Sequence, residues 1–300
     1  MYSNILNNKN HTREIIHYCC GSYYFGHIGG VPRYDYQISL AFPDYKHFTA
    51  PQQKRVMLEY LKRCKNPLVI TDNHLSCDIP NEYEILLVHH GVAKTHAIRE
   101  PGWGKSGLTA LCCKGQGQML SYREPNKTHI ISISQFCTDE FTKYNGSLYT
   151  RFKNTKILHP SELDERIHKI KWNTSPIVLG NWQNINKGLS VVKILANNRN
   201  FSFRLLQVYL TNAGINNFNE RKQQIYLDSD IFLQLSLCEG YSYATLDALL
   251  CGIPVVASNV GLFYKDVPED CFVKIEWERN GDVKYVEERL KYAWENKDEI

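Results

Sequence analysis

One stretch of the chain, Cys238 to Val260, constrains the fold more than any other part of the sequence. It follows the apolar run Ile231 to Leu237, which has the length of a buried strand. Ala244 to Leu250 contains mostly good helix formers, and Pro254 to Ala257 has the pattern of another buried parallel strand. The stretch therefore predicts a strand, a loop, a helix and a second strand, which is the repeating unit of an α/β sheet.

Both ends of this predicted helix carry local signals. Ser242 can act as the N-cap, because its hydroxyl can accept from a free backbone N–H of the first turn. Gly252 supplies a left-handed stop, and Pro254 forbids continuation of the helix. Glu239 and Tyr241 then lie in a loop beyond the carboxyl end of a strand, which is where open α/β sheets bind ligands.

The two acidic residues of the stretch suggest a nucleotide ligand that carries a sugar. Free N–H groups and the helix dipole at a helix N-terminus favour a phosphate. Because a carboxylate beside a phosphate is repelled by it, Glu239 is expected to serve sugar hydroxyls or a cationic transition state. Asp247 follows eight residues later and can accept two hydroxyl groups of a ribose from the same helix.

Residues Glu239 to Ser258 read Glu-Gly-Tyr-Ser-x4-Asp-Ala-x2-Cys-Gly-Ile-Pro-Val-Val-Ala-Ser. This resembles the E-x7-E block of glycosyltransferase family 4, the retaining GT-B enzymes. The family form is roughly EGFGLxxxEAxACGxPVVAS, so Ser242 replaces a glycine and Asp247 replaces the second glutamate. The resemblance implies that Glu239 acts at the donor sugar, that Asp247 holds the ribose, and that no metal is needed.

Two loops resemble other segments of the same family. Gly29 and Gly30 precede Val31 and Arg33, like the GGVxR loop that lies under the donor diphosphate. From the residues alone, a glycine pair between a strand and a helix serves either close approach to a phosphate or a simple turn.

The loop from Gly180 to Gly188 resembles the GRxxxxKG diphosphate clamp, with Lys187 as its lysine and Asn181 in place of its arginine. The alternative for Lys187 is a surface lysine. Tyr241, Ser242 and Tyr243 around the helix start complete the predicted donor-binding set.

Histidines follow two apolar runs in the first half of the chain. His90-Gly91 resembles the family's "vHG" segment, whose histidine faces the acceptor and the donor sugar, so His90 is a catalytic candidate. His74 is an acceptor-side candidate, since polar residues past a strand's carboxyl end are where this architecture binds ligands. A capped strand end with a hydrogen-bonded histidine is the alternative for both. His89 is expected to point away from His90, because side chains alternate along a strand.

Strand and helix patterns alternate along both halves of the chain and restart after a charged stretch that ends before Pro176. This rhythm predicts parallel, doubly wound sheets. The expected architecture is GT-B, with two Rossmann-like lobes that face a central cleft. The expected domains are residues 1–165 on the acceptor side and residues 166–300 for the nucleotide sugar. Glu100 to Gly107 fails as a P-loop, since Arg99 stands where the first glycine belongs.

Composition sets the remaining expectations. A net charge of +4 without a dense basic run excludes a nucleic-acid signature, and it is compatible with an anionic nucleotide sugar or with peripheral contact to an anionic membrane. The ten cysteines form no CxxC pair and no ligand-like spacing with histidine, so we expect no metal and reduced thiols in a cytoplasmic protein. The polar start and the lack of a long apolar run predict neither a signal peptide nor a membrane span.

The sequence therefore predicts a cytoplasmic, metal-independent retaining glycosyltransferase of the hexosyltransferase type. Its donor would be a nucleoside diphosphate sugar, and its acceptor would be a glycan, a lipid or a protein-linked sugar. Two alternatives stay open. One is a degenerate binding or scaffold protein that kept the fold without turnover, and the other is a GT-B sugar-nucleotide epimerase.

Overall fold

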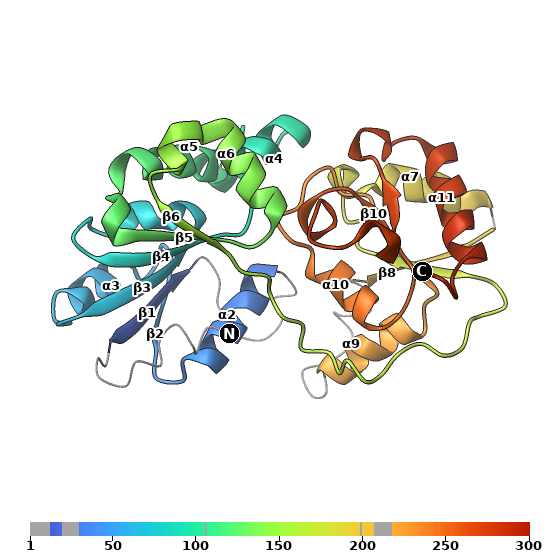
Figure 1. Cartoon of the computed structure of the whole chain (residues 1–300), viewed down its shortest axis with the longest axis horizontal. Coiled ribbons are helices and arrows are strands. Elements are labelled where there is room, and N and C mark those ends of the chain that lie inside the picture. Colours follow the sequence, from blue (N-terminus) through green and yellow to red (C-terminus); the bar gives the residue numbers. More distant parts are fainter. Residues whose placement is uncertain (1–12, 20–29, 106, 199, 207–217) are drawn as a thin grey trace. The chain divides into compact units, whose positions relative to one another are not determined.

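Alternating strands and helices build two β-sheets, each made of parallel strands (Figure 1). The computed structural model describes residues 13–19, 30–105, 107–198, 200–206 and 218–300. One sheet has six strands in the order β2-β1-β3-β4-β5-β6, and the other has five in the order β11-β10-β9-β7-β8. Each described strand pairing is parallel, which confirms the predicted α/β fold class.

The first unit is built on the six-stranded sheet. Its strands are β1 (Glu14–Cys19), β2 (Lys46–Thr49), β3 (Pro67–Asp72), β4 (Glu84–His89), β5 (Thr128–Ser132) and β6 (Lys153–Lys156). Its helices are α2 (Gly30–Ala41), α3 (Lys54–Leu61), α4 (Ala93–Arg99), α5 (Gly107–Tyr122) and α6 (Gln135–Tyr149), with 3-10 turns η1 (Asn73–Asp78) and η2 (Pro125–Lys127). In Figure 1, α2 lies on one side of this sheet and α5 and α6 lie on the other.

The second unit is built on the five-stranded sheet. Its strands are β7 (Ile177–Gly180), β8 (Ser202–Leu205), β9 (Ile231–Gln234), β10 (Val255–Ser258) and β11 (Val273–Ile275). Its helices are α7 (Leu189–Leu195), α9 (Phe218–Leu227), α10 (Tyr243–Leu250) and α11 (Val283–Glu295). Its 3-10 turns are η3 (Ile185–Lys187), η4 (Ala196–Asn198), η5 (Gly261–Phe263), η6 (Glu269–Cys271) and η7 (Trp277–Arg279).

The stretch around α10 has the predicted strand, loop, helix and strand. Gly252 has a φ of 66° after the helix, so the expected left-handed stop is present. The expected cap at Ser242 is wrong in one respect. Ser242 precedes α10, but its side chain makes no capping hydrogen bond and its hydroxyl instead contacts Oγ1 of Thr245. Its φ of 78° explains why a glycine suits this position in the family pattern.

Both sheets change winding direction at the same kind of place. The first strand of each unit, β1 or β7, lies between the second and the third strand of that unit. In such sheets ligands bind outside the carboxyl ends of the strands on either side of this switch. By internal packing the units comprise residues 1–97, 102–133 and 137–158, and residues 98–101, 134–136 and 159–300.

A hydrophobic core joins the five-stranded sheet to α7 and α11. It includes the buried side chains of Val178, Val192, Leu195, Ile231, Leu233, Val256, Ile275, Val286 and Leu290. None of the helices in the described part of the chain combines the length and the apolar composition needed to cross a bilayer. The cysteines in that part form no disulfide.

Asp230 fastens the start of the second unit to its sheet. Its carboxylate accepts from the backbone N–H of Asn173 at 3.0 Å and of Ile177 at 2.8 Å, and lies 3.1 Å from Nζ of Lys169. The Asp230 and Lys169 side chains are 0% and 2% exposed. Burial by itself raises the pKa of Asp230, but the hydrogen bonds from Asn173 and Ile177 outweigh it, so this pKa lies below its usual value.

We expect Asp230→Ala to lower the free energy of unfolding by about 3–5 kcal/mol, since it leaves the buried Lys169 ammonium without its carboxylate. Because the folded-state pKa of Asp230 is depressed, its contribution is present above the unfolded pKa of about 3.9 and is lost as pH falls through the folded-state pKa. Urea unfolding at neutral and acidic pH measures both effects. Asp228→Ala, at an exposed position nearby, should change stability by less than about 0.5 kcal/mol. Equal losses of unfolding free energy in the two variants would show that pairing of Asp230 with Lys169 does not stabilise the fold.

Candidate functional site

Polar side chains collect at the switch point of the second unit. The loops that follow β7 and β9 enclose a small cavity of about 40 Å³, which has room for a few atoms of a ligand. Four of the predicted donor-site residues line it, namely Asn181, Lys187, Glu239 and Ser242. The remaining lining residues are Trp182, Phe232, Leu233, Gln234, Leu235, Ser236 and Ala244.

The position of Lys187 depends on close packing between the two loops. Lys187 ends η3, and Gly188 follows with a φ of 84°. A Cβ atom on Gly188 would lie 2.4 Å from Cβ of Leu235, so only glycine fits there. The N–H of Leu237 also donates to the carbonyl of Asn186 at 3.0 Å. The lysine–glycine pair of the sequence motif therefore brings Lys187 beside the end of β9.

Lys187 and Glu239, which the sequence assigned to separate roles, form an ion pair through Nζ and Oε1. The same carboxylate oxygen accepts from Oγ of Ser236 at 2.7 Å. Burial lowers the pKa of Lys187, but the charge of Glu239, the hydrogen bond to its carboxylate and the charge of Glu100 together outweigh this effect, so the pKa of the ammonium lies above its usual value. Lys187 is therefore a protonated cation, half-buried at the switch point.

Gln234, the last residue of β9, is a site residue that sequence reasoning missed. It lines the cavity with a side chain that is 6% exposed, and neither its Oε1 nor its Nε2 has a hydrogen-bond partner. Such buried polar atoms are rare and need an explanation. The signal in the sequence was a single polar residue inside an apolar strand. Its amide can both donate to and accept from a polar ligand.

Tyr241 and Tyr243 lie outside the cavity lining. The hydroxyl of Tyr241 donates to the carbonyl of His159 at 2.6 Å. The ring of Tyr243 stacks on the imidazole of His159 with centroids 5.3 Å apart and planes at 8°. Both tyrosines thus hold the segment before the second unit's first strand against the start of α10, and the structure records no cavity contact for either.

Asp247, the predicted ribose ligand, is engaged in a buried polar cluster. It is 1% exposed. Its Oδ1 accepts from Oγ of Ser161 at 2.7 Å, and its Oδ2 lies 3.3 Å from Nζ of Lys222 on α9. Lys222 also lies 3.5 Å from Glu162. The sequence offered no sign of this cation, because Lys222 and Asp247 meet only through the packing of two helices.

In the first unit, His90 forms a buried pair with Asp72. His90 Nε2 lies 3.0 Å from Oδ1 of Asp72, and its backbone N–H donates to the side chain of Asn73 at 3.0 Å. His89 is on the opposite face of the sheet, as strand alternation predicts, and stacks on Phe141 with centroids 4.0 Å apart. Burial lowers the pKa of His89 to about 3, so this imidazole is neutral and structural.

The other predicted residues of the first unit have different surroundings. His74 Nδ1 lies 3.3 Å from the thiol of Cys112, and burial lowers the pKa of His74. A Cβ atom on Gly115 would lie 2.4 Å from Cβ of His74, which explains a glycine inside α5. Gly30 is the first residue of α2, and Gly29 lies outside the described residues.

We expect Gly188→Ala to cost about 1–3 kcal/mol of stability, because alanine is strained at this φ and its methyl group would overlap Leu235. The loop should move, and Lys187 with it. Urea unfolding measures the stability. The matched control is Gly281→Ala, where a Cβ would meet nothing within 4 Å and φ is ordinary. A Gly188 variant as stable as the Gly281 variant would show that the close approach is not needed.

Comparison with solved structures reveals a shared fold. The chain is similar to sucrose-phosphate synthase from Thermosynechococcus elongatus, with a TM-score of 0.71 and 13% identity over 95% of this chain and 91% of that chain. It is similar to HepE from Anabaena in complex with UDP and glucose, with a TM-score of 0.61 and 11% identity over 95% and 90% of the two chains.

A third similar structure is WaaG, a glycosyltransferase involved in lipopolysaccharide biosynthesis, with a TM-score of 0.58 and 13% identity over 94% and 95% of the chains. No protein-family model and no curated protein sequence matches this chain. At these identities the likeness establishes the fold alone. The chain has the α/β GT-B architecture, built from two Rossmann-like units.

Proposed function

We propose that this protein is a retaining glycosyltransferase that moves a hexosyl group from a nucleoside diphosphate sugar to a glycan, lipid or protein-linked acceptor. The observation that carries the proposal is the group at the switch point of the second unit, where Lys187, Glu239, Ser236 and Gln234 meet. It offers one cation, one carboxylate and an unsatisfied amide. A GT-B fold shared with proteins that carry glycosyltransferase names supports the same reaction class.

Lys187 is the proposed partner of the donor diphosphate. A protonated ammonium can take the charge of the leaving diphosphate, so this step needs no metal ion at the donor site. Because Lys187 pairs with Glu239, the diphosphate has to compete with that carboxylate. Its arrival would free Glu239 for hydroxyl groups of the sugar, while Ser236 still holds one carboxylate oxygen.

Glu239 is the proposed catalytic carboxylate. It would lie beside the positive charge that develops on the reacting sugar, if a few atoms of that sugar enter the cavity next to Gln234. Only an interaction that strengthens in the transition state accelerates the reaction.

His90, oriented by Asp72, is the proposed catalytic histidine of the first unit, and His74 is a weaker acceptor-side residue. The nucleotide-sugar role of Asp247 would require its carboxylate to leave Ser161 or Lys222.

A binding protein without turnover is the second candidate, and a specific observation favours it. The Asp247 carboxylate is already occupied by Lys222 and Ser161, and Asn181 stands where the family's clamp has an arginine. Such a protein would bind a nucleoside diphosphate but would not catalyse transfer of a sugar. An active enzyme and a binding protein therefore differ in catalysis rather than in ligand affinity.

Lys187→Ala should weaken nucleoside diphosphate binding by about 1.5–3 kcal/mol, the range for a hydrogen bond to a charged group, which is roughly 10-fold to 150-fold in Kd. Calorimetric titration with UDP, GDP and ADP measures the change. Lys193→Ala is the matched control, since Lys193 is exposed on the next helix. Unchanged affinity in Lys187→Ala would make Lys187 a structural partner of Glu239 only.

Turnover in Glu239→Gln tests the function itself. Wild-type protein is incubated with UDP-, GDP- and ADP-sugars and a panel of sugar acceptors, and released nucleoside diphosphate is measured. We expect the variant to lose about 100-fold or more in turnover, on the scale of one preorganised electrostatic contact. Its nucleoside diphosphate affinity should not fall, because glutamine releases Lys187 from the ion pair.

Melting temperature and the exposed substitution Glu288→Gln on α11 control for nonspecific damage. Full activity in Glu239→Gln would remove Glu239 from the reaction. Binding of a nucleoside diphosphate with no turnover of any sugar in the wild-type protein would favour the binding protein instead.

A further inference from the structure

A second group of reactive side chains lies in the first unit, at the carboxyl ends of β1 and β3. His17 and Cys19 share one face of β1, because they are two residues apart on a strand. Asp72 ends the neighbouring strand β3, whose pairing with β1 runs through Tyr18 and Thr71. Asp35 reaches the same place from α2. All four side chains are 0% exposed.

The donor atoms of this group lie close enough together to converge on one metal ion. Those of His17, Cys19, Asp35 and Asp72 are all within 4.8 Å of one another. Cys19 Sγ lies 3.2 Å from Oδ2 of Asp35, and His17 Nε2 lies 3.4 Å from Oδ1 of Asp35. With metal–ligand bonds of 2.0–2.3 Å, two ligand atoms on a tetrahedral ion are roughly 3.3–3.7 Å apart.

Several of these polar atoms have no other role. Neither ring nitrogen of His17 makes a hydrogen bond, and Oδ1 of Asp35 and Oδ2 of Asp72 make none either. The contact between His17 and Asp35 is close but lacks hydrogen-bond geometry. Buried polar groups are almost always hydrogen-bonded, so an orphaned set that converges on one point indicates a ligand.

The charges of the group also favour a cation. Asp35 and Asp72 place two fully buried carboxyl groups in one cluster. A buried carboxylate without a cation is costly, and a divalent ion would relieve two of them.

The types of donor atom select the ion. A thiolate, an imidazole nitrogen and carboxylate oxygens are the ligands of zinc, whereas Mg²⁺ and Ca²⁺ prefer oxygen alone. Complete burial of all four side chains matches a closed structural site rather than an open catalytic one.

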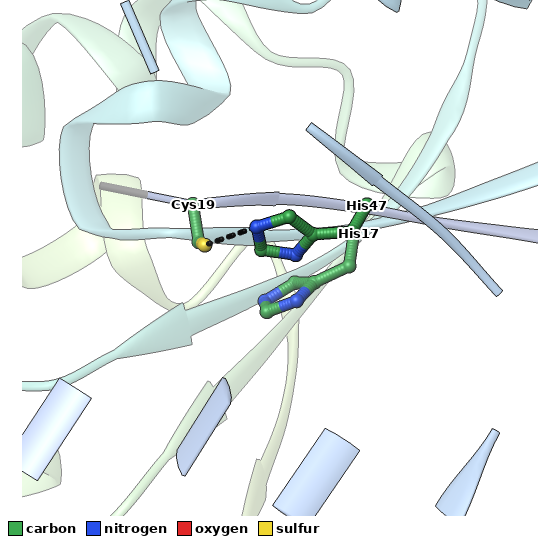
Figure 2. Close-up of side chains that lie close together, drawn as sticks. All are labelled: His17, Cys19 and His47. Atoms are coloured by element: carbon green, nitrogen blue, oxygen red, sulfur yellow. Dashed lines mark hydrogen bonds between the residues drawn. The ribbon is translucent and has the colours of Figure 1, made fainter. Parts of the chain in front are cut away.

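His47 lies beside this group, as Figure 2 shows with His17 and Cys19. It sits opposite His17 in the β1–β2 pairing, and its Nε2 is 4.0 Å from Cys19 Sγ. However, the same nitrogen faces Oγ1 of Thr49 at 3.4 Å, and the residue is only half-buried. The fully buried carboxylates are therefore better placed to complete the site.

We propose that His17, Cys19, Asp35 and Asp72 bind one zinc-class divalent ion that ties β1, α2 and β3 of the first unit together. The sequence search missed this site because its ligands come from three elements spread over residues 17–72. The expectation of no ligand-like spacing between cysteine and histidine overlooked His17 and Cys19, whose two-residue spacing on a strand puts both side chains on one face. The inference does not rest on the proposed sugar transfer, although Asp72 also contacts His90, the proposed catalytic histidine.

The test is metal analysis and cobalt spectroscopy on the untagged 300-residue chain. We expect one zinc per chain after purification, and a thiolate-to-cobalt charge-transfer band when Co²⁺ replaces it. Cys19→Ser should abolish the band, whereas the control Cys271→Ser, a free thiol of the second unit, should leave it unchanged. Asp35→Asn should lower zinc affinity by more than the roughly 10–100-fold caused by losing a residue that only orients a ligand.

Three results would overturn the proposal. The first is a wild-type chain that retains no zinc and binds none at micromolar concentration, which would indicate a buried network with a protonated Asp35. The second is a cobalt band that survives Cys19→Ser. The third is loss of the ion in His47→Ala with full retention in Asp72→Asn. Circular dichroism and melting temperature show whether each variant is folded before its metal content is compared.

Discussion

Parallel strand pairing throughout both sheets is the constraint on which the rest of this structure depends. It brings the carboxyl ends of all strands in a sheet to one edge, so the loops that follow distant strands become neighbours there. Lys187 after β7 and Glu239 after β9 are 52 residues apart in sequence and form an ion pair for this reason. His17 on β1 and Asp72 on β3 meet in the same way. The topology therefore determines where polar chemistry can collect.

Local signals in the sequence predicted the fold, and they singled out Asn181, Lys187, Glu239 and Ser242, which the structure brings to one cavity. The stop at Gly252 and the apolar runs around α10 act over a few residues, so they could be read directly. The contacts that give the site its chemistry are long-range. Nothing near Glu239 in the sequence indicates that its partner is Lys187, and nothing near Asp247 indicates Lys222. Gln234 appeared as one polar residue in a strand, and only packing shows that its amide is buried without a partner.

Three buried or half-buried carboxylates of the second unit are each paired with a lysine. Glu239 has Lys187, Asp247 has Lys222, and Asp230 has Lys169. Pairing of this kind limits the cost of desolvating a charge, and it also commits both partners to each other. A ligand that needs one member must therefore replace the other. For Lys187 a diphosphate can do so with two or more negative charges, whereas a neutral sugar hydroxyl could not displace Lys222 from Asp247 as easily.

The switch points of the two units solve the same electrostatic problem differently. Between β7 and β9, a lysine from the neighbouring loop neutralises the carboxylate of Glu239. Between β1 and β3, the fully buried carboxyl groups of Asp35 and Asp72 face the thiol of Cys19 and the imidazole of His17. In the second unit, the side chain of Lys187 already provides the positive charge. In the first unit, four donor atoms converge, and a metal ion is the kind of cation that can bind all four at once.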